Sequence, residues 1–86
     1  MTADKLLTVY SRPGCHLCEE MWRQLQGLQR EIPFRLTLVD VDEIPEMRMR
    51  YDTRVPVLVH EDQVLCELFL DEARVREYLC VGVNGV

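Results

Sequence analysis

The sequence predicts a single α/β domain over residues 1–86, with a core of about residues 6–79. Short apolar runs of strand length alternate with longer segments whose apolar residues recur every three or four positions, and proline or glycine separates the two kinds. The resulting order is β-α-β-α-β-β-α. A helix that joins two parallel strands makes a right-handed crossover, whereas the short turn between the last two strands requires them to be antiparallel. We therefore expect a four-stranded mixed sheet with helices on both faces.

The first half of the chain is expected to form a strand, a helix and a second strand. The apolar run at residues 6–10 predicts a buried strand of ordinary length. After a turn at residues 11–14, a helix is expected to run to about Arg30, because Pro33 cannot continue it. Residues 34–39 alternate and then become fully apolar, which predicts the second strand. The apolar stripe of the helix consists of Cys18, Met21, Trp22, Leu25 and Leu28.

A short helix and a hairpin are expected next. Residues 44–51 predict the helix, for which Asp42 can serve as the N-cap. Residues 55–59 predict a third strand, and residues 64–68 predict a fourth. The polar turn at residues 60–63 joins them as a hairpin.

The last helix is expected to begin after Asp71, which is a good N-cap residue. Leu70 and Val75 have the spacing of a hydrophobic staple around that cap. Gly82 is the expected stop, because glycine is common just beyond helix ends, and residues 83–86 remain as a short tail.

Composition and charge argue against several classes of function. The formal net charge is −5, and acidic residues are interleaved with the arginines, so no basic surface for nucleic acid is predicted. The N-terminus lacks the features of a signal peptide, and no segment approaches the roughly 20 apolar residues that span a bilayer. We therefore expect a cytoplasmic monomer that binds neither nucleic acid nor membrane.

Cys15 and Cys18 form a Cys-x-x-Cys pair between the first strand and the first helix, which is the sequence sign of a redox dithiol. At a helix start, unpaired backbone N–H groups and the helix dipole lower the pKa of a thiol, so we expect Cys15 to be the nucleophile. Cys18 belongs to the apolar stripe and is expected to be the less exposed, resolving thiol. Residues three apart within a helix are about 5–6 Å apart at Cβ, farther than a disulfide allows, so Cys15 must lie at the frayed helix start.

Three neighbours of the dithiol are expected to contact substrate or tune the thiols. His16 and Leu17 lie between the cysteines, where side chains influence the redox potential, and Leu17 is the better candidate for a substrate contact. Arg12 could steady the Cys15 thiolate or a carboxylate of a bound thiol. For Arg12 and His16, simple exposure to solvent is an equal alternative.

Two motifs make the chain resemble the thioredoxin-like superfamily, and more closely a divergent, compact group of glutaredoxin-like proteins. They are Pro13-Gly14-Cys15-His16-Leu17-Cys18 and, about forty residues later, Arg54-Val55-Pro56. The resemblance covers about residues 6–79. It implies a glutaredoxin-type fold in which Pro56 is cis and packs against the active-site disulfide, while the backbone of Val55 pairs with the substrate.

The resemblance also implies a function. The chain would be a thiol–disulfide oxidoreductase that carries electrons to disulfides of proteins or to glutathione mixed disulfides. Its reductant would be glutathione or an enzyme of the thioredoxin reductase type, and it would need no cofactor beyond its own dithiol. The Gly-Gly pair that holds glutathione in many glutaredoxins is absent from the matching segment, residues 65–71, which argues against glutathione as a specific ligand.

Other readings remain open. The cysteine pair could bind zinc with two further ligands, or hold an iron–sulfur cluster bridged between two subunits, or the fold could be a non-catalytic interaction domain. Zinc sites normally bring a second closely spaced pair, which this chain lacks. Cys66 is expected to be a buried thiol, with a third redox thiol as the alternative, and Cys80 is expected to be a bystander. The remaining candidate zinc ligands are Cys66, Cys80, His16 and His60.

Overall fold

The computed structural model describes the backbone of residues 5–84 and the side chains of residues 5–79. The predicted order of strands and helices is confirmed, with one short 3₁₀ helix added between the second strand and the second helix. The elements are β1 (Leu6–Ser11), α1 (His16–Gln29), β2 (Arg35–Asp40), η1 (Val41–Glu43), α2 (Pro45–Tyr51), β3 (Val57–His60), β4 (Gln63–Glu67) and α3 (Glu72–Asn84).

The four strands form one mixed sheet in the order β2-β1-β3-β4. β1 pairs with β2 in parallel and with β3 in antiparallel orientation, and β3 and β4 form the expected antiparallel hairpin. Tyr10 near the end of β1 is paired with Val57 at the start of β3. The loop that leaves β1 and the loop that enters β3 therefore lie at the same edge of the sheet.

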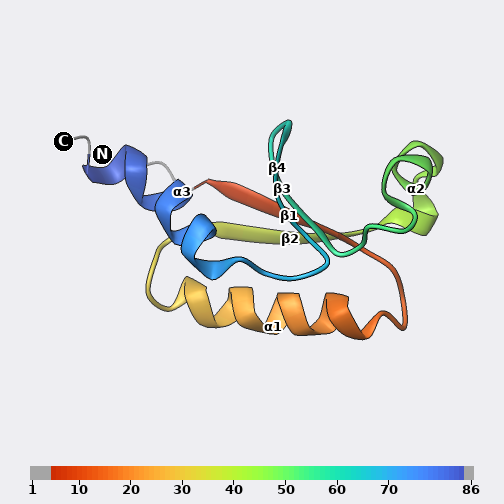
Figure 1. The fold of residues 1–86 in the computed structure, drawn as a ribbon, viewed down its shortest axis with the longest axis horizontal. Helices are drawn as coiled ribbons and strands as arrows, with labels where there is room; N and C mark the ends of the chain where they lie inside the picture. The colour runs from red at the N-terminus through yellow and green to blue at the C-terminus, as the bar shows by residue number, and fades with distance from the viewer. Residues whose placement is uncertain (1–4, 85–86) are drawn as a thin grey trace.

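Helices cover both faces of the sheet, as predicted. Side chains alternate along β1, so that Leu7 and Val9 point to one face while Tyr10 points to the other. The first face packs against α1 and α3, and this larger core consists of Leu7, Val9, Met21, Leu25, Leu28, Phe34, Leu58, Leu65, Cys66, Val75 and Leu79. The second face packs against η1 and α2 through Val41, Tyr51, Val57 and Val59. Figure 1 shows α2 and the start of α1 at one end of the molecule and α3 at the other.

The prediction that Asp42 caps α2 is wrong. Asp42 lies within η1, and Asp40 caps that 3₁₀ helix by accepting a hydrogen bond from the Asp42 N–H at 2.9 Å. α2 begins directly afterwards, with Ile44 as an N-cap that makes no side-chain hydrogen bond. The extra 3₁₀ turn therefore releases the Asp42 carboxylate for another partner.

The turn between β3 and β4 and the end of α3 also differ from the sequence-based expectation. The connection between β3 and β4 is only two residues long, and Glu61 adopts the left-handed conformation that such a tight turn requires. α3 begins at the predicted cap, where the Asp71 carboxylate accepts the Arg74 N–H at 3.1 Å. The helix continues to Asn84 instead of stopping at Gly82, because glycine weakens a helix without forcing it to end.

No helix in the part of the chain that the structure describes has the length and apolar character needed to cross a membrane.

Two neighbouring leucines test the assignment of the larger core. Leu7 is 0% exposed and Leu6 is 41% exposed. Leu7→Ala is expected to lower the free energy of unfolding by about 2–5 kcal/mol, because it leaves a cavity between β1 and α1. Leu6→Ala, the matched control, should cost less than about 1 kcal/mol. Urea denaturation followed by circular dichroism measures both, and equal losses would contradict the strand register.

Candidate active site

The two cysteines of the predicted dithiol are joined by a disulfide at the start of α1, with their Cα atoms 5.2 Å apart. Cys15 is the N-cap of α1 and has extended backbone angles (φ −89°, ψ 110°), so it lies outside the helix. The pair can therefore meet the geometry of a disulfide, as the sequence required. The Cys18 N–H donates a hydrogen bond to the Cys15 sulfur at 3.2 Å. The sulfur of Cys15 thus already faces a backbone donor at the positive end of the helix.

The cysteines differ in exposure. Cys18 is 4% exposed and is among the buried residues, whereas Cys15 is only half-buried. An incoming group can therefore reach Cys15 more easily than Cys18.

A tight turn before Cys15 sets its position. Gly14 has φ +75°, in the region that residues with a side chain rarely adopt, and a Cβ at this position would have open space around it. The Cys15 N–H donates to the carbonyl of Arg12 at 3.2 Å and closes the turn. Backbone conformation, and not crowding, therefore explains the glycine.

The peptide bond between Val55 and Pro56 is cis, as the resemblance implied. Pro56 is buried and Val55 is half-buried. Because β3 runs antiparallel to β1, this loop lies at the same sheet edge as the cysteine loop. The Pro56 carbonyl accepts the N–H of Leu68 at 2.8 Å, which attaches the loop after β4 to the same edge.

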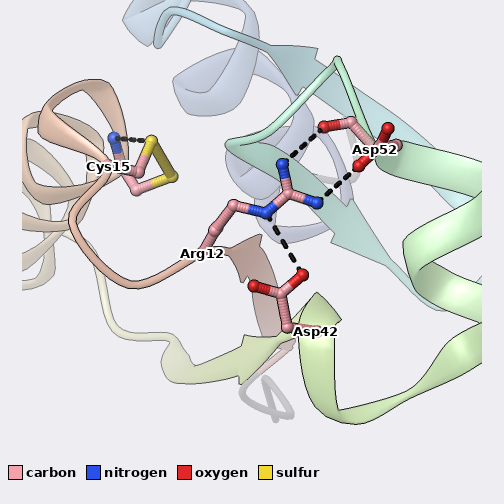
Figure 2. The surroundings of a disulfide bond; sticks show 5 residues. Arg12, Cys15, Asp42 and Asp52 are labelled. Atoms are coloured by element: carbon pink, nitrogen blue, oxygen red, sulfur yellow. Dashed lines mark hydrogen bonds and ion pairs between the residues drawn. A yellow bond between two sulfur atoms is a disulfide. The ribbon is translucent and has the colours of Figure 1, made fainter.

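Arg12 is held by two aspartates. Its Nε donates to the Asp42 carboxylate at 3.2 Å, and its two Nη atoms donate to the Asp52 carboxylate at 2.5 Å and to the Asp52 backbone oxygen at 3.2 Å. Figure 2 shows the guanidinium turned toward these aspartates and away from the disulfide. Arg12 therefore connects the cysteine loop to η1 and to the segment that leads into the cis-proline loop.

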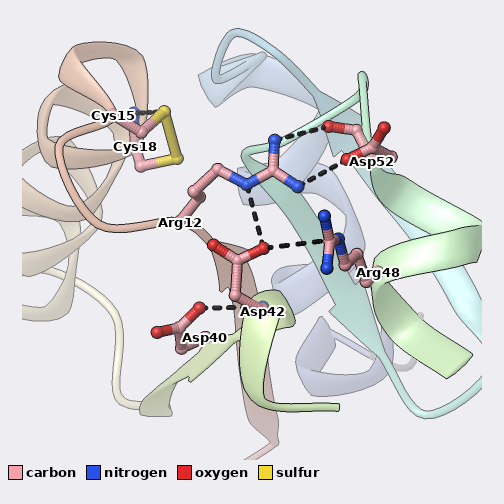
Figure 3. Close-up of polar contacts among 7 residues, drawn as sticks. All are labelled: Arg12, Cys15, Cys18, Asp40, Asp42, Arg48 and Asp52. Atoms are coloured by element: carbon pink, nitrogen blue, oxygen red, sulfur yellow. Dashed lines mark hydrogen bonds and ion pairs between the residues drawn. A yellow bond between two sulfur atoms is a disulfide. The ribbon is translucent and has the colours of Figure 1, made fainter. Parts of the chain in front are cut away.

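The surrounding charges extend this connection. Arg48 of α2 approaches Asp42 at 3.9 Å, and Asp40 holds the backbone of Asp42, as Figure 3 shows. The hydrogen bond from Arg12 and its positive charge hold the pKa of Asp52 below the ordinary aspartate value, and the same contacts raise the pKa of Arg12. Both groups are therefore charged throughout the neutral range.

A second arginine strengthens the same edge. Arg54 pairs with Glu67 at the end of β4, with a distance of 2.5 Å between Nη2 and Oε2. Its guanidinium also lies 5.4 Å from the centre of the Tyr51 ring. Arg54 thus links the residues before the cis-proline to the hairpin. Nothing in its local sequence pattern indicated these partners.

A groove of about 390 Å³ runs beside the disulfide, between α1 and β2. Both cysteines line it, together with Pro13, Trp22 and Leu38. The sequence had assigned Trp22 to the buried stripe of α1, and it does border the core, but part of its surface faces this groove. The position of Trp22 four residues after Cys18 was the signal that could have associated it with the site.

A smaller hollow of about 170 Å³ lies between α1 and the loop after β4. Its lining includes Leu17 of the cysteine motif and Leu68 and Phe69 from the loop after β4. His16 is exposed and lines neither space. Among the predicted substrate contacts, Leu17 is therefore part of a recess, while His16 faces solvent.

Cys66 is a free, buried thiol, as predicted. It belongs to the larger core, its sulfur accepts the Asp71 N–H at 3.4 Å, and burial raises its pKa. These features favour an unreactive thiol. The side chain of Cys80 lies outside the described residues. Within residues 5–79, no group of three or more His, Cys, Asp or Glu side chains is arranged to hold a metal ion.

Comparisons with known proteins identify a matching family and solved structures with a similar fold. The family model described as "Glutaredoxin-like domain (DUF836)" matches residues 6–80. The solution structure of protein Ne2328 from Nitrosomonas europaea is 41% identical, with 92% of this chain and 95% of that chain covered and a TM-score of 0.84. A structural genomics target protein, XcR50, from X. campestris is 28% identical, with 87% and 96% covered and a TM-score of 0.68.

More distant structures share the fold alone. Fasciola hepatica thioredoxin is 22% identical, with 91% of this chain and 80% of that chain covered and a TM-score of 0.60. The comparison with curated proteins gave no match.

The contact between Arg12 and Asp52 predicts a defined pH dependence. The low pKa of Asp52 means that its contribution to stability is complete above the ordinary aspartate pKa and is lost as pH falls through the lower value of the folded state. The difference in unfolding free energy between the wild type and Arg12→Gln should therefore shrink as the pH falls below the ordinary aspartate pKa of about 4. Urea titrations at several pH values measure this difference.

Arg35→Gln is the matched control, because Arg35 is exposed on β2 and makes no ion pair with any residue that the structure describes. Its effect should be small and should not follow the titration of Asp52. A pH-independent loss in Arg12→Gln would show that the ion pair with Asp52 does not carry the effect.

Proposed function

The chain belongs to the family of glutaredoxin-like domains (DUF836), and from this premise we propose that it is a thiol–disulfide oxidoreductase. The observation that carries the proposal is the Cys15–Cys18 disulfide at the start of α1. Cys15 is the more exposed sulfur and accepts a backbone hydrogen bond, and Cys18 is buried behind it. This is the arrangement that an attacking and a resolving thiol need.

The proposed reaction begins with the reduced dithiol. The Cys18 N–H and the positive end of the α1 dipole stabilise the Cys15 thiolate. The thiolate attacks one sulfur of a substrate disulfide, forms a mixed disulfide and releases the other sulfur as a thiolate, which takes a proton from water. The Cys18 thiol then loses its proton and attacks Cys15, which releases the second substrate sulfur. Two electrons pass to the substrate, and the Cys15–Cys18 disulfide remains.

The surrounding loops would position the substrate. The backbone of Val55, beside the buried cis-proline Pro56, is the proposed pairing partner for the segment that carries the substrate sulfur. Leu17 supplies an apolar contact, and the exposed His16 lies where it can tune the dithiol or meet the substrate. Arg12 is engaged by Asp42 and Asp52, which supports a role in holding the cysteine loop.

The cycle needs an external reductant. Glutathione or an enzyme of the thioredoxin reductase type would supply the two electrons that reopen the disulfide, and a cytoplasmic setting would provide either. We propose no cofactor beyond the dithiol. No specific observation in the described residues favours a zinc or iron–sulfur centre over this chemistry.

Substitution of each cysteine tests the assignment of roles. Cys15→Ser is expected to abolish reduction of insulin disulfides, because no thiolate remains to attack. Cys18→Ser should retain the attack and accumulate a mixed disulfide, which mass spectrometry of the intact protein detects. Cys66→Ala is the matched control, because this buried thiol has no part in the proposed cycle, and its activity should remain close to that of the wild type.

Two outcomes would count against the proposal. Full activity in Cys15→Ser would reverse the roles of the two thiols. A stoichiometric zinc signal that disappears with a chelator and is lost in Cys15→Ser would favour a metal-binding module instead.

A further inference from the structure

We propose that the group that reacts with Cys15 is a polypeptide whose disulfide cysteine has apolar side chains on both sides, and not a glutathione mixed disulfide. The inference rests on the proposed thiol–disulfide exchange and names its substrate class. Three observations support it: two apolar recesses on opposite sides of α1, the first lined by both cysteines and the second by Leu17, an exposed aromatic side chain beside the second, and the absence of an unpaired cation from their linings.

The first recess is the groove between α1 and β2. Trp22 and Leu38 form its apolar walls, and both cysteines line it. Leu38 is paired with the core residue Val9, yet it is 52% exposed, because the groove separates it from α1. A large apolar side chain in the groove would cover Leu38 and Trp22 while remaining next to the sulfurs.

The second recess is the hollow between α1 and the loop after β4. Leu68 adopts a left-handed conformation (φ 69°), and its N–H is held by the Pro56 carbonyl. In this turn Phe69 is left 67% exposed beside Leu17. Leu68 and Phe69 thus place two bulky apolar side chains in the same recess as Leu17. An exposed apolar cluster of this kind is typical of a surface that binds another chain.

The periodicity of α1 places the two recesses on opposite sides of the helix. The first is lined by helix residues Cys18, Glu19, Trp22, Arg23 and Gln26, and the second by Leu17, Glu20, Met21 and Gln24. At about 100° per residue, these two sets are centred roughly half a turn apart. Cys15 precedes the helix and lines the first recess, and Leu17, two residues later, lines the second. A segment that crosses the helix start with its cysteine on Cys15 therefore directs its flanking side chains toward one recess on each side.

The charges favour such a segment over glutathione, which carries two carboxylates. Both arginines that line the first recess are already paired, Arg12 with two aspartates and Arg23 with Glu20 at 2.9 Å. The second recess has no arginine or lysine in its lining, and Glu20 is its only charged residue. The chain as a whole carries a formal net charge of −5, which further disfavours an anionic tripeptide.

The test compares three chromogenic substrates on the reduced wild-type protein. Each contains one cysteine in a mixed disulfide with 2-nitro-5-thiobenzoate. The first is a neutral, capped peptide with Phe and Leu on both sides of the cysteine, the second has Ser and Gly instead, and the third is the glutathione mixed disulfide. Attack by Cys15 on the cysteine sulfur releases the coloured thiolate, and rates with dithiothreitol correct for intrinsic reactivity.

The wild type is expected to reduce the apolar peptide roughly tenfold faster, in kcat/KM, than either of the other substrates. Phe69→Ala and Leu38→Ala should each remove part of this preference, measured as the ratio of the rates on the apolar and Ser-Gly peptides within the same variant. Met49→Ala is the matched control, because Met49 is 86% exposed on α2 and lines neither recess. It should keep the full preference.

A second readout avoids chemistry. Trp22 is the only tryptophan of the chain, so its fluorescence reports on the first recess. The measurement uses the Cys15→Ser protein and peptides in which serine replaces the cysteine. The apolar peptide should change the emission of Trp22, and the Ser-Gly peptide should not. No change in emission would overturn the inference for the first recess.

Other outcomes separate the inference from the function on which it rests. Equal rates on the two peptides, or fastest reduction of the glutathione mixed disulfide, would overturn the inference and leave the oxidoreductase standing. A dimer that dissociates in Phe69→Ala, seen by gel filtration, would assign the apolar surface to a second copy and also overturn it. If the reduced wild type acts on none of the three substrates, the proposed function itself fails.

Discussion

The pairing of β1 with β3 is the constraint on which the rest of this molecule depends. β1 is a central strand, and its last residues pair with the first residues of β3. Because the two strands are antiparallel, the loop that carries Cys15 and the loop that carries the cis-proline Pro56 emerge at one edge, although forty residues separate them. A shift of one residue in this register would turn Leu7 and Val9 out of the core, so burial of the hydrophobic face also determines the geometry of the site. The same strand register therefore buries the core side chains and brings the two loops of the candidate site together.

Ion pairs also connect the loops that the strands bring to this edge of the sheet. Arg12 connects the cysteine loop to Asp42 and Asp52, and Arg54 connects the cis-proline segment to Glu67. Exposed ion pairs contribute little stability one at a time. Here they join segments that lie far apart in the sequence. Their main effect is consequently to restrict how the loops move relative to one another, and they also neutralise cations that would otherwise attract anionic ligands to this edge.

Local sequence patterns predicted most of the fold and the dithiol. They did not predict contacts between residues that lie far apart in the sequence. Apolar periodicity located the strands and α1, and the position of Cys15 after a Pro-Gly turn indicated that it caps a helix. The partners of Arg12 lie 30 and 40 residues away, and no local rule pairs them. Asp42 was misassigned because an inserted 3₁₀ turn is a tertiary choice that its sequence does not require. The groove beside Trp22 likewise arises only when β2 is brought alongside α1.

The position of Cys15 as an N-cap affects how far α1 would change between the oxidised and reduced states of the proposed cycle. The Cys15 carbonyl accepts the Glu19 N–H at 3.1 Å, so the residue stays attached to α1 through its backbone when the bond between the two sulfurs is broken. The recesses on either side of α1 are therefore expected to keep their shape whether the sulfurs are joined or free. A rigid surface of this kind cannot distinguish its electron donor from its electron acceptor by a change of shape. In the proposed exchange the two would then compete for the same face, and their concentrations and reduction potentials would decide the direction of electron flow.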